Sequence, residues 1–310
     1  MADDRSSLSA AAITPTLGPA SRAQAQISDL LAEPLAPGLY LVATPIGNLG
    51  DITLRALSVL ARADTIYCED TRHSAKLLQH YAIATRTRPF HDHNEERESE
   101  RVIAELKADK RIAIISDAGT PLLSDPGFKL VRAAAAEGIP VIAIPGASAL
   151  LSALTTSGLP TDAFFFVGFL PPKQAARRTR LAELSSVPGS LVFYEAPHRV
   201  AETISDMAHL LGERQAVIAR ELTKLHEDVV RGSLAELAET TPVDGLKGEV
   251  VIVVGPEQAQ AVSDEALTAR LAGALEVMSL KDAAKALADE FGVPKARVYG
   301  LGIKAKDAKR

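Results

Sequence analysis

The segment that most constrains the fold covers residues 111–127, because it changes character in its middle. Residues 112–115 form a short apolar run, which is typical of a strand buried on both faces of a parallel sheet. The run stops at Ser116-Asp117. The next residues are Ala118 and Gly119, whose small side chains let a ligand approach the main chain. In open α/β sheets, ligands bind at the carboxyl ends of the strands. The segment therefore predicts a buried strand that carries a binding loop.

The same pattern of strand and loop recurs along the first half of the chain. Apolar runs at 39–43, 65–68 and 141–144 are each followed by a polar or small-residue loop, with helical spacing between them. The sequence therefore predicts an α/β fold. The loop after the first run has glycines but neither the G-x-G-x-x-G spacing nor a P-loop lysine, so a ligand contact and a plain tight turn both remain open.

Length and composition indicate two α/β domains and a tail. The chain has 310 residues, of which 47% are hydrophobic and 24% charged. A turn cluster at 157–162 is the best boundary, and strands of mixed order are expected after it. We expect the following organisation: a disordered extension at 1–36, an N-terminal α/β domain at 37–158, a C-terminal α/β domain at 159–256 and a helical tail at 263–310.

Charge and cysteine usage exclude several classes of protein. The formal net charge of −5 argues against a generally basic nucleic-acid binder, so any RNA contact must come from a local patch. No apolar run approaches the ~18 residues of a membrane helix, and no signal pattern is present. Cys68 is the only cysteine, which excludes an intrachain disulfide and a tetrathiolate zinc site. A cytoplasmic location is expected.

Three polar clusters follow predicted strands, at 69–73, 195–199 and 220–224. Such clusters at a binding edge indicate chemistry, although structural ion pairs at a domain junction would use the same residues. His91 and His93 have the spacing of a chelating pair. A loop that enters a helix explains the same residues without a further ligand, so no metal is predicted.

One local basic patch stands out in this acidic chain. Either a solvated helix face or an RNA contact explains it. Its members are Lys173, Arg177, Arg178 and Arg180.

The loops favour a nucleoside-type cofactor held mainly by backbone atoms. A nicotinamide dinucleotide needs a pyrophosphate cradle, and ATP needs a lysine and a metal-binding carboxylate in recognisable spacing. S-adenosyl-L-methionine needs neither, because its sulfonium already activates the methyl group and the protein has only to align donor and acceptor.

A succession of motifs resembles one known family. The strings are residues 42–51, 69–72, 93–95, 116–121, 145–148, 169–171, 194–199 and 220–224. Together they are similar to the small-subunit ribosomal RNA methyltransferase branch of the tetrapyrrole methylase-like superfamily. The resemblance covers residues 38–254, with a looser match in the helical tail and none in the N-terminal extension.

The resemblance implies a homodimer of two α/β domains with S-adenosyl-L-methionine in the cleft between them. The implied reaction is methylation of the ribose 2′-hydroxyl of a cytidine in the decoding region of 16S rRNA. Expected cofactor contacts are Pro45, Asp117, Ala118, Gly119, Ser148, Ala149, Leu170, Tyr194 and Ala219.

A ribose hydroxyl is a poor acid, so a base that takes its proton or a cation that stabilises the oxyanion would increase the reaction rate by a factor of ~10² to 10⁴. Asp70 and Glu221 are candidate bases, and His198 is a candidate base or hydrogen-bond partner. Arg72, Arg199 and Arg220 are candidates for phosphate or oxyanion contact. Each of these residues could instead form a structural ion pair at the domain junction.

Three other functions remain open. The first is a tetrapyrrole or other small-molecule methyltransferase on the same fold. The second is a non-catalytic RNA-binding protein, which would have no need of an open nucleoside site. The third, a nicotinamide-dependent oxidoreductase, lacks a phosphate cradle.

Overall fold

The computed structural model describes residues 18–257 and 263–307, with side chains through residue 305. The chain divides after Gly255 into two compact units, which are described separately. No helix in the described part of the chain is long and apolar enough to cross a membrane.

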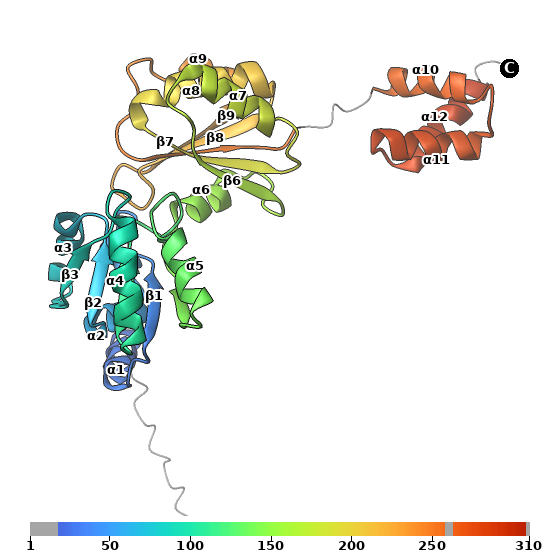
Figure 1. Cartoon of the computed structure of the whole chain (residues 1–310). Coiled ribbons are helices and arrows are strands. Elements are labelled where there is room, and N and C mark those ends of the chain that lie inside the picture. Colours follow the sequence, from blue (N-terminus) through green and yellow to red (C-terminus); the bar gives the residue numbers. More distant parts are fainter. Residues whose placement is uncertain (1–17, 258–262, 308–310) are drawn as a thin grey trace, which may run out of the picture. The chain divides into compact units, whose positions relative to one another are not determined.

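The first unit begins with a five-stranded sheet of order β3-β2-β4-β1-β5, in which every pairing is parallel (Figure 1). The strands are β1 (Gly38–Val42), β2 (Thr65–Cys68), β3 (Thr87–Pro89), β4 (Arg111–Ile115) and β5 (Val141–Ile144). The predicted strands at 39–43, 65–68 and 112–115 are present and buried. The fourth, β5, is only half-buried, because it is the edge strand and Ala143 is exposed.

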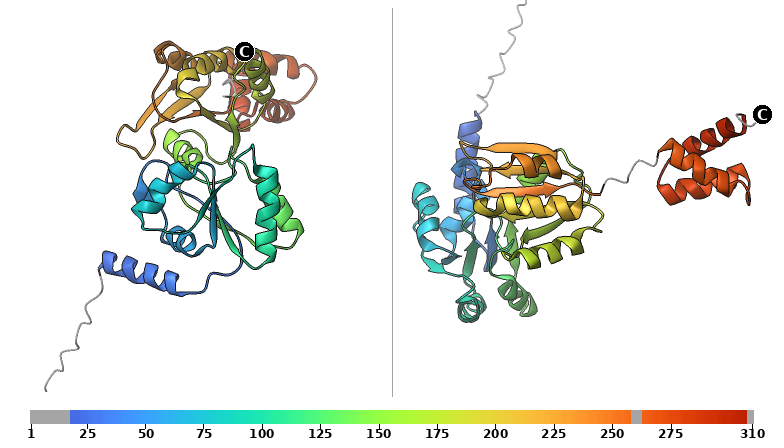
Figure 2. Two further views of the ribbon diagram at one scale, coloured as in Figure 1. Left: turned by 60° about the vertical axis from the view of Figure 1, so that its left-hand side comes forward. Right: turned by 90° about the horizontal axis from the view of Figure 1, so that it is seen from above.

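Helices cover both faces of this sheet, which explains the continuous apolar strands. The helices α2 (Leu54–Arg62) and α3 (Thr71–His80) pack on one face through Val59, Leu60 and Leu78. The helices α4 (Glu95–Lys107) and α5 (Phe128–Ala136) pack on the other face. Figure 2 shows the two helical layers on either side of the strands.

The predicted disordered extension is partly wrong, because α1 (Pro19–Ala32) is a helix. Proline at its first turn and an alanine-rich sequence favour helix formation. Although α1 buries none of its residues, Ser58 Oγ and Arg62 Nη1 of α2 donate to the Leu30 carbonyl at 2.9 and 2.7 Å. Residues 1–17 of the extension lie outside the described residues.

The second sheet has the order β6-β7-β10-β8-β9 and is mixed, as the sequence predicts. Only β6 (Phe164–Phe169) and β7 (Ser190–Glu195) pair in parallel. The antiparallel strands are β8 (Gln215–Arg220), β9 (Asp228–Ser233) and β10 (Val250–Val254).

One face of the second sheet is covered by α7 (Gln174–Leu184), α8 (Val200–Leu211) and α9 (Leu234–Thr240). Its other face packs against α6 (Ala149–Ser157), through Leu150, Ala153 and Leu154. The helix α6 precedes the predicted boundary at 158, yet its apolar side belongs to the core of the second sheet. The predicted domain limits therefore remain a prediction.

The second unit contains α10 (Asp264–Ala274), α11 (Leu280–Phe291) and α12 (Lys295–Asp307). Leu267 and Leu271 of α10 pack against Ala284 and Leu287 of α11 in a separate apolar core. Ser279 caps α11 by accepting a hydrogen bond from the Asp282 N–H, which explains where that helix begins.

Candidate active site

The loops after β1 and β4 are joined at the carboxyl edge of the first sheet. Thr44 N–H donates to the Gly119 carbonyl at 2.9 Å, and Gly119 N–H donates to the Thr44 carbonyl at 3.0 Å. Thr44 Oγ1 also donates to the Ser116 carbonyl at 3.2 Å. The N–H and C=O of Gly119 therefore bond within the protein, whereas Ala118 is exposed.

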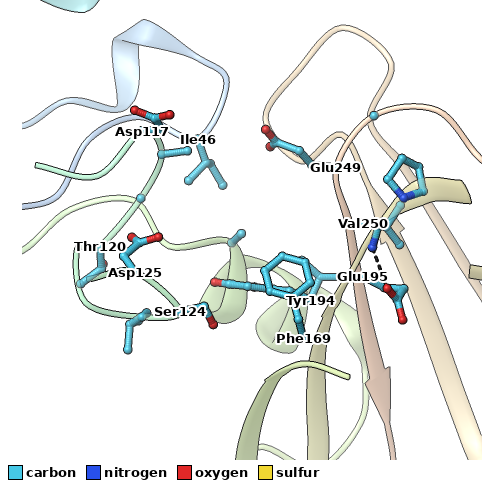
Figure 3. A pocket seen from close by; sticks show the side chains of 18 residues that line it. Ile46, Asp117, Thr120, Ser124, Asp125, Phe169, Tyr194, Glu195, Glu249 and Val250 are labelled. Carbon is cyan, nitrogen blue, oxygen red and sulfur yellow. Dashed lines mark hydrogen bonds between the residues drawn. The ribbon is translucent and has the colours of Figure 1, made fainter. Parts of the chain in front are cut away.

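A hollow of about 410 Å³ lies between these loops and the second sheet (Figure 3). From the first sheet it is lined by the segments 117–120 and 123–125, and from the second sheet by Phe169 and Tyr194. The Tyr194 ring points into the hollow toward Asp125. Apolar and aromatic walls with a few polar groups suit a nucleoside.

A second hollow, of about 310 Å³, opens beside the first. It is lined by Pro45 and Gly47 of the first loop, by His73 and Lys76 of α3, and by Lys224. Four residues line both hollows, which therefore form one continuous cleft: Ile46, Asp117, Ala118 and Glu249.

Carboxylates give the larger hollow a negative character. Burial, followed by the charges of Glu69 and Asp117, raises the pKa of Asp125 to about 6. Burial and the charge of Asp117 likewise raise the pKa of Glu69. A cationic ligand would relieve this repulsion, whereas an anionic one would increase it.

The structure brings together five of the predicted cofactor residues around the larger hollow: Asp117, Ala118, Gly119, Ala149 and Tyr194. Pro45 lines the smaller hollow instead.

The remaining three predicted cofactor residues, Ser148, Leu170 and Ala219, line neither hollow. Ser148 is buried and caps α6 by accepting a hydrogen bond from Leu151 N–H. Leu170 and Ala219 lie in the apolar cores of the second sheet.

None of the six predicted catalytic residues lines either hollow. Asp70 caps α3 and pairs with Arg72 at 3.0 Å, and these hydrogen bonds lower the pKa of Asp70 to about 2. Asp70 N–H donates to Asp117 Oδ1 at 3.2 Å. The geometry thus makes Asp70 a neighbour that orients Asp117, and its low pKa makes it a weak base.

Glu221 likewise has a positioning role, because its carboxylate binds Lys224 and the backbone of Glu249. Its Oε1 accepts Lys224 Nζ at 2.8 Å and the Glu249 N–H at 2.9 Å, and these two hydrogen bonds lower the pKa of Glu221. Its backbone is left-handed, with φ 51°.

The other three candidates also line neither hollow. Arg199 donates to the carbonyls of Leu170 and Pro171 and pairs with buried Glu195 at 3.4 Å. Arg220 lies 3.6 Å from Asp228, and His198 is exposed on the short helix η2 (Pro197–Arg199).

The predicted RNA patch divides into a buried part and an exposed part. Arg177 is wrong for an RNA contact, because its side chain is 0% exposed and its Nε lies 2.7 Å from Asp206 Oδ2. Arg178 is half-exposed and also pairs with Asp206, while Arg180 pairs with Glu183 and Lys173 is exposed.

The histidine pair lies in a polar loop before α4. The rings of His91 and His93 are 6.0 Å apart, and within residues 18–257 and 263–305 no group of three His, Cys, Asp or Glu side chains could hold a metal ion.

The cleft contains residues that were not candidates, among them Lys76, Asp125 and Glu249. It also contains Phe169 and Lys224, which lie in the motifs at 169–171 and 220–224 but had no role assigned to them. Asp125 precedes Pro126 and Gly127, which indicate a turn, and Glu249 precedes an apolar run, which indicates a strand, so neither position by itself indicates a ligand contact. One signal was available for Lys224 and Glu249. Lys224 follows the strand that ends at Arg220, Glu249 precedes the strand that begins at Val250, and these two strand ends meet because the strands pair antiparallel.

The chain matches a family described as Tetrapyrrole (Corrin/Porphyrin) Methylases over residues 38–238. It is 48% identical to the ribosomal RNA small subunit methyltransferase I of Mesorhizobium japonicum, over 90% of this chain and 96% of that protein. It is 47% identical to the protein of that name from Pseudomonas aeruginosa, over 84% and 95% of the two chains.

Solved structures show the same fold at lower identity. A diphthine synthase matches with a TM-score of 0.55 and 17% identity, covering 70% of this chain and 89% of that one. The uroporphyrin-III C-methyl transferase of Thermus thermophilus, in complex with S-adenyl homocysteine, matches with a TM-score of 0.51 and 21% identity, covering 70% and 97%.

Proposed function

The chain belongs to the tetrapyrrole (corrin/porphyrin) methylase family, and from that premise we propose that it methylates the ribose 2′-hydroxyl of a cytidine in 16S rRNA, with S-adenosyl-L-methionine as donor. The observation that supports this most strongly is the 48% identity to a ribosomal RNA small subunit methyltransferase I over nearly the whole of that relative.

The larger hollow suits the donor in shape and in charge. Phe169 and Tyr194 offer aromatic walls for an adenine, and Asp117 and Asp125 offer negative charge for the sulfonium and ammonium groups. A nicotinamide dinucleotide, which carries a pyrophosphate, would meet repulsion from the same carboxylates. When bound, the donor supplies an activated methyl group.

The smaller hollow suits the acceptor. His73, Lys76 and Lys224 supply hydrogen-bond donors for a ribose and its phosphates, whereas the larger hollow is lined mainly by apolar groups and carboxylates. Because the hollows share Asp117 and Glu249, a nucleotide in the smaller one would lie next to a methyl group in the larger one.

Methyl transfer to RNA can be tested directly. Purified protein is incubated with methyl-labelled S-adenosyl-L-methionine and small ribosomal subunits from cells that lack the modification, and the RNA is then digested to nucleosides. We expect label in a 2′-O-methylated cytidine. Label in another position would redefine the acceptor.

Absence of label in RNA, with the cofactor still bound by calorimetry, would transfer the proposal to a tetrapyrrole or other small-molecule acceptor. RNA bound without any cofactor binding would instead support a non-catalytic RNA-binding protein.

We also propose that the protein is a homodimer. Two phenylalanines at the start of edge strand β6 are exposed and lie outside both hollows, namely Phe164 (43%) and Phe165 (41%). An exposed apolar edge is characteristic of an interface. Phe165→Asp should shift the protein toward monomer in analytical ultracentrifugation, whereas Val243→Asp, on the exposed loop between α9 and β10, should not. The proposed location is the cytoplasm, where the rRNA acceptor is found.

A further inference from the structure

Glu249 occupies the junction of the two hollows. Its side chain lines both of them and is 68% exposed, and it faces Asp117 across the mouth of the cleft (Figure 3). A group at this junction lies next to the place where donor and acceptor would meet.

The side chain and the backbone of Glu249 are each held by a separate contact. Oε2 lies 3.2 Å from Lys224 Nζ, and the backbone N–H donates to Glu221 Oε1 at 2.9 Å. The Glu249 carbonyl accepts the Glu221 N–H at 2.9 Å. Within the described residues, Oε1 has no hydrogen-bond partner, so one carboxylate oxygen is available to a ligand.

The turn that supports this arrangement is strained. Glu221 and Thr223 have left-handed backbones, with φ 51° and 68°, and neither is a glycine. Gly248 lies against the Glu221 carboxylate with φ 85°, and a Cβ there would overlap that carboxylate. Lys224 in turn lies over Gly47 of the first sheet, where a Cβ would overlap the lysine chain. Strain of this kind persists where the surrounding structure enforces it, and it is concentrated at functional sites.

We propose that Glu249 is the catalytic residue that accepts the proton of the acceptor hydroxyl, and that Glu221 and Lys224 are its positioning residues. This inference rests on the proposed function. The acceptor hydroxyl gives its proton to the Glu249 carboxylate as its oxygen bonds to the methyl carbon. The electron pair of the broken carbon–sulfur bond stays on the donor's sulfur, which becomes a neutral thioether.

Neighbouring carboxylates are less suited to this role. Asp117 accepts the Asp70 N–H and lies among Glu69 and Asp125, where a cationic donor needs negative charge. Glu195 also lines the larger hollow, but it is buried and bonded to Thr203 and Arg199. Lys224 is a poor base: burial alone would lower its pKa, but the hydrogen bonds that its ammonium group donates to Glu221 and Glu249 outweigh burial and raise that pKa.

A binding cycle tests the contact without turnover. Small subunits are reconstituted with 16S rRNA that carries either the natural ribose or a 2′-deoxyribose at the methylated nucleotide, and affinities are measured with S-adenosylhomocysteine present. A hydrogen bond from the hydroxyl to a carboxylate should favour the natural subunit by roughly 10-fold or more in the wild type. In Glu249→Ala the preference should fall below about 2-fold.

Rates and controls complete the test. Glu249→Gln should reduce the single-turnover rate at saturating donor and RNA by ~10² to 10⁴. Lys224→Met should show a smaller loss, which Lys224→Arg restores. Glu239→Gln, an exposed glutamate of α9, should change neither quantity.

The two proposals fail in different ways. If Glu249→Ala keeps the full preference for the natural ribose, or Glu249→Gln keeps the wild-type rate, the role of Glu249 is overturned while methylation by the wild type stands. If the wild type does not label RNA, the proposed function fails before any variant is compared. Cofactor affinity within about threefold of wild type, by calorimetry, shows that the variants are folded.

Discussion

Arg177 and Asp206 form an ion pair inside the helical layer of the second sheet, with Nε and Oδ2 2.7 Å apart and side chains 0% and 1% exposed. Arg178 donates to the other oxygen of Asp206, also at 2.7 Å. Burial alone would raise the pKa of Asp206, but the hydrogen bonds from Arg178 and Arg177 outweigh it and lower that pKa. The pair ties α7 to α8.

Asp206→Ala should destabilise the protein by about 3–5 kcal/mol, because it removes the buried partner of the Arg177 guanidinium and leaves only the exposed Glu202 carboxylate, 3.3 Å from Nη2. Urea unfolding at pH 7 measures the change. Glu183→Ala is the matched control, since it breaks an exposed pair with Arg180 of the same 2.7 Å length and should cost about 1 kcal/mol or less. Equal losses in the two variants would contradict a structural role for the buried pair.

The exposed residues of the basic patch lead to a different prediction. Lys173 is exposed and can bind a phosphate, and Arg180 forms only an exposed ion pair with Glu183, which an RNA phosphate can replace. Changing both to alanine should weaken RNA binding and reduce the slope of log K against log salt by roughly 1 to 2, one phosphate contact for each residue. Lys110→Ala, an exposed residue just before β4, should leave the slope unchanged. An unaltered slope in the double variant would remove the patch from the RNA interface.

Gly119 joins the two loops through backbone hydrogen bonds and has φ 79°. A Cβ at this position would lie 3.2 Å from Ile46 Cγ2, at the wall of both hollows. Gly119→Ala should therefore lose cofactor affinity by roughly 10-fold in calorimetry, in addition to about 1 kcal/mol of stability from the left-handed backbone.

Gly138→Ala separates these two effects. Gly138 has φ 69°, but a Cβ there would meet nothing within 4 Å. It should show the loss of stability and no loss of cofactor affinity. If both variants bind the cofactor normally, Ile46 does not transmit the loop geometry to the site.

The sequence was most informative about the strands and the loops that follow them. Residues 112–115 and 65–68 were predictable because strands covered on both faces read as continuous apolar runs. The burial of Arg177 was not predictable, since its partner Asp206 lies 29 positions away and helical spacing alone does not place it. Glu249 was likewise hidden, because its position depends on a left-handed turn at Glu221 and on the pairing of β8 with β10.

Asp64 and Arg111 form a partly buried pair at the start of β4, with Oδ1 and Nη2 2.7 Å apart. The Arg111 hydrogen bond lowers the pKa of Asp64 to about 2. A lowered pKa stabilises the folded state above the unfolded pKa near 4, and this contribution disappears as the pH falls toward 2. Asp64→Asn should therefore cost about 1–2 kcal/mol at pH 7 and progressively less below pH 4, in urea unfolding. A loss that does not depend on pH would show that packing, rather than charge, is responsible.

Asp125 should show the opposite dependence. Its pKa of about 6 exceeds the ordinary value of 3.8, so the folded state binds a proton more tightly than the unfolded state does. The ionised carboxylate therefore destabilises the fold at pH 7, and stability recovers as the pH falls from about 6 toward 4. Asp125→Asn should gain about 1–3 kcal/mol at pH 7, measured by urea unfolding, and no comparable gain at pH 4.

The same substitution should weaken donor binding, because it removes a negative charge that faces a cation. In calorimetry the wild-type affinity for S-adenosyl-L-methionine should fall as the pH drops from 7 to 5, whereas Asp125→Asn should bind more weakly and with less dependence on pH. Asp162→Asn, on an exposed turn, is the control for both measurements. Gain of stability together with loss of affinity would identify Asp125 as a residue retained for binding at the expense of stability. Unchanged affinity would place the donor's positive charge away from Asp125.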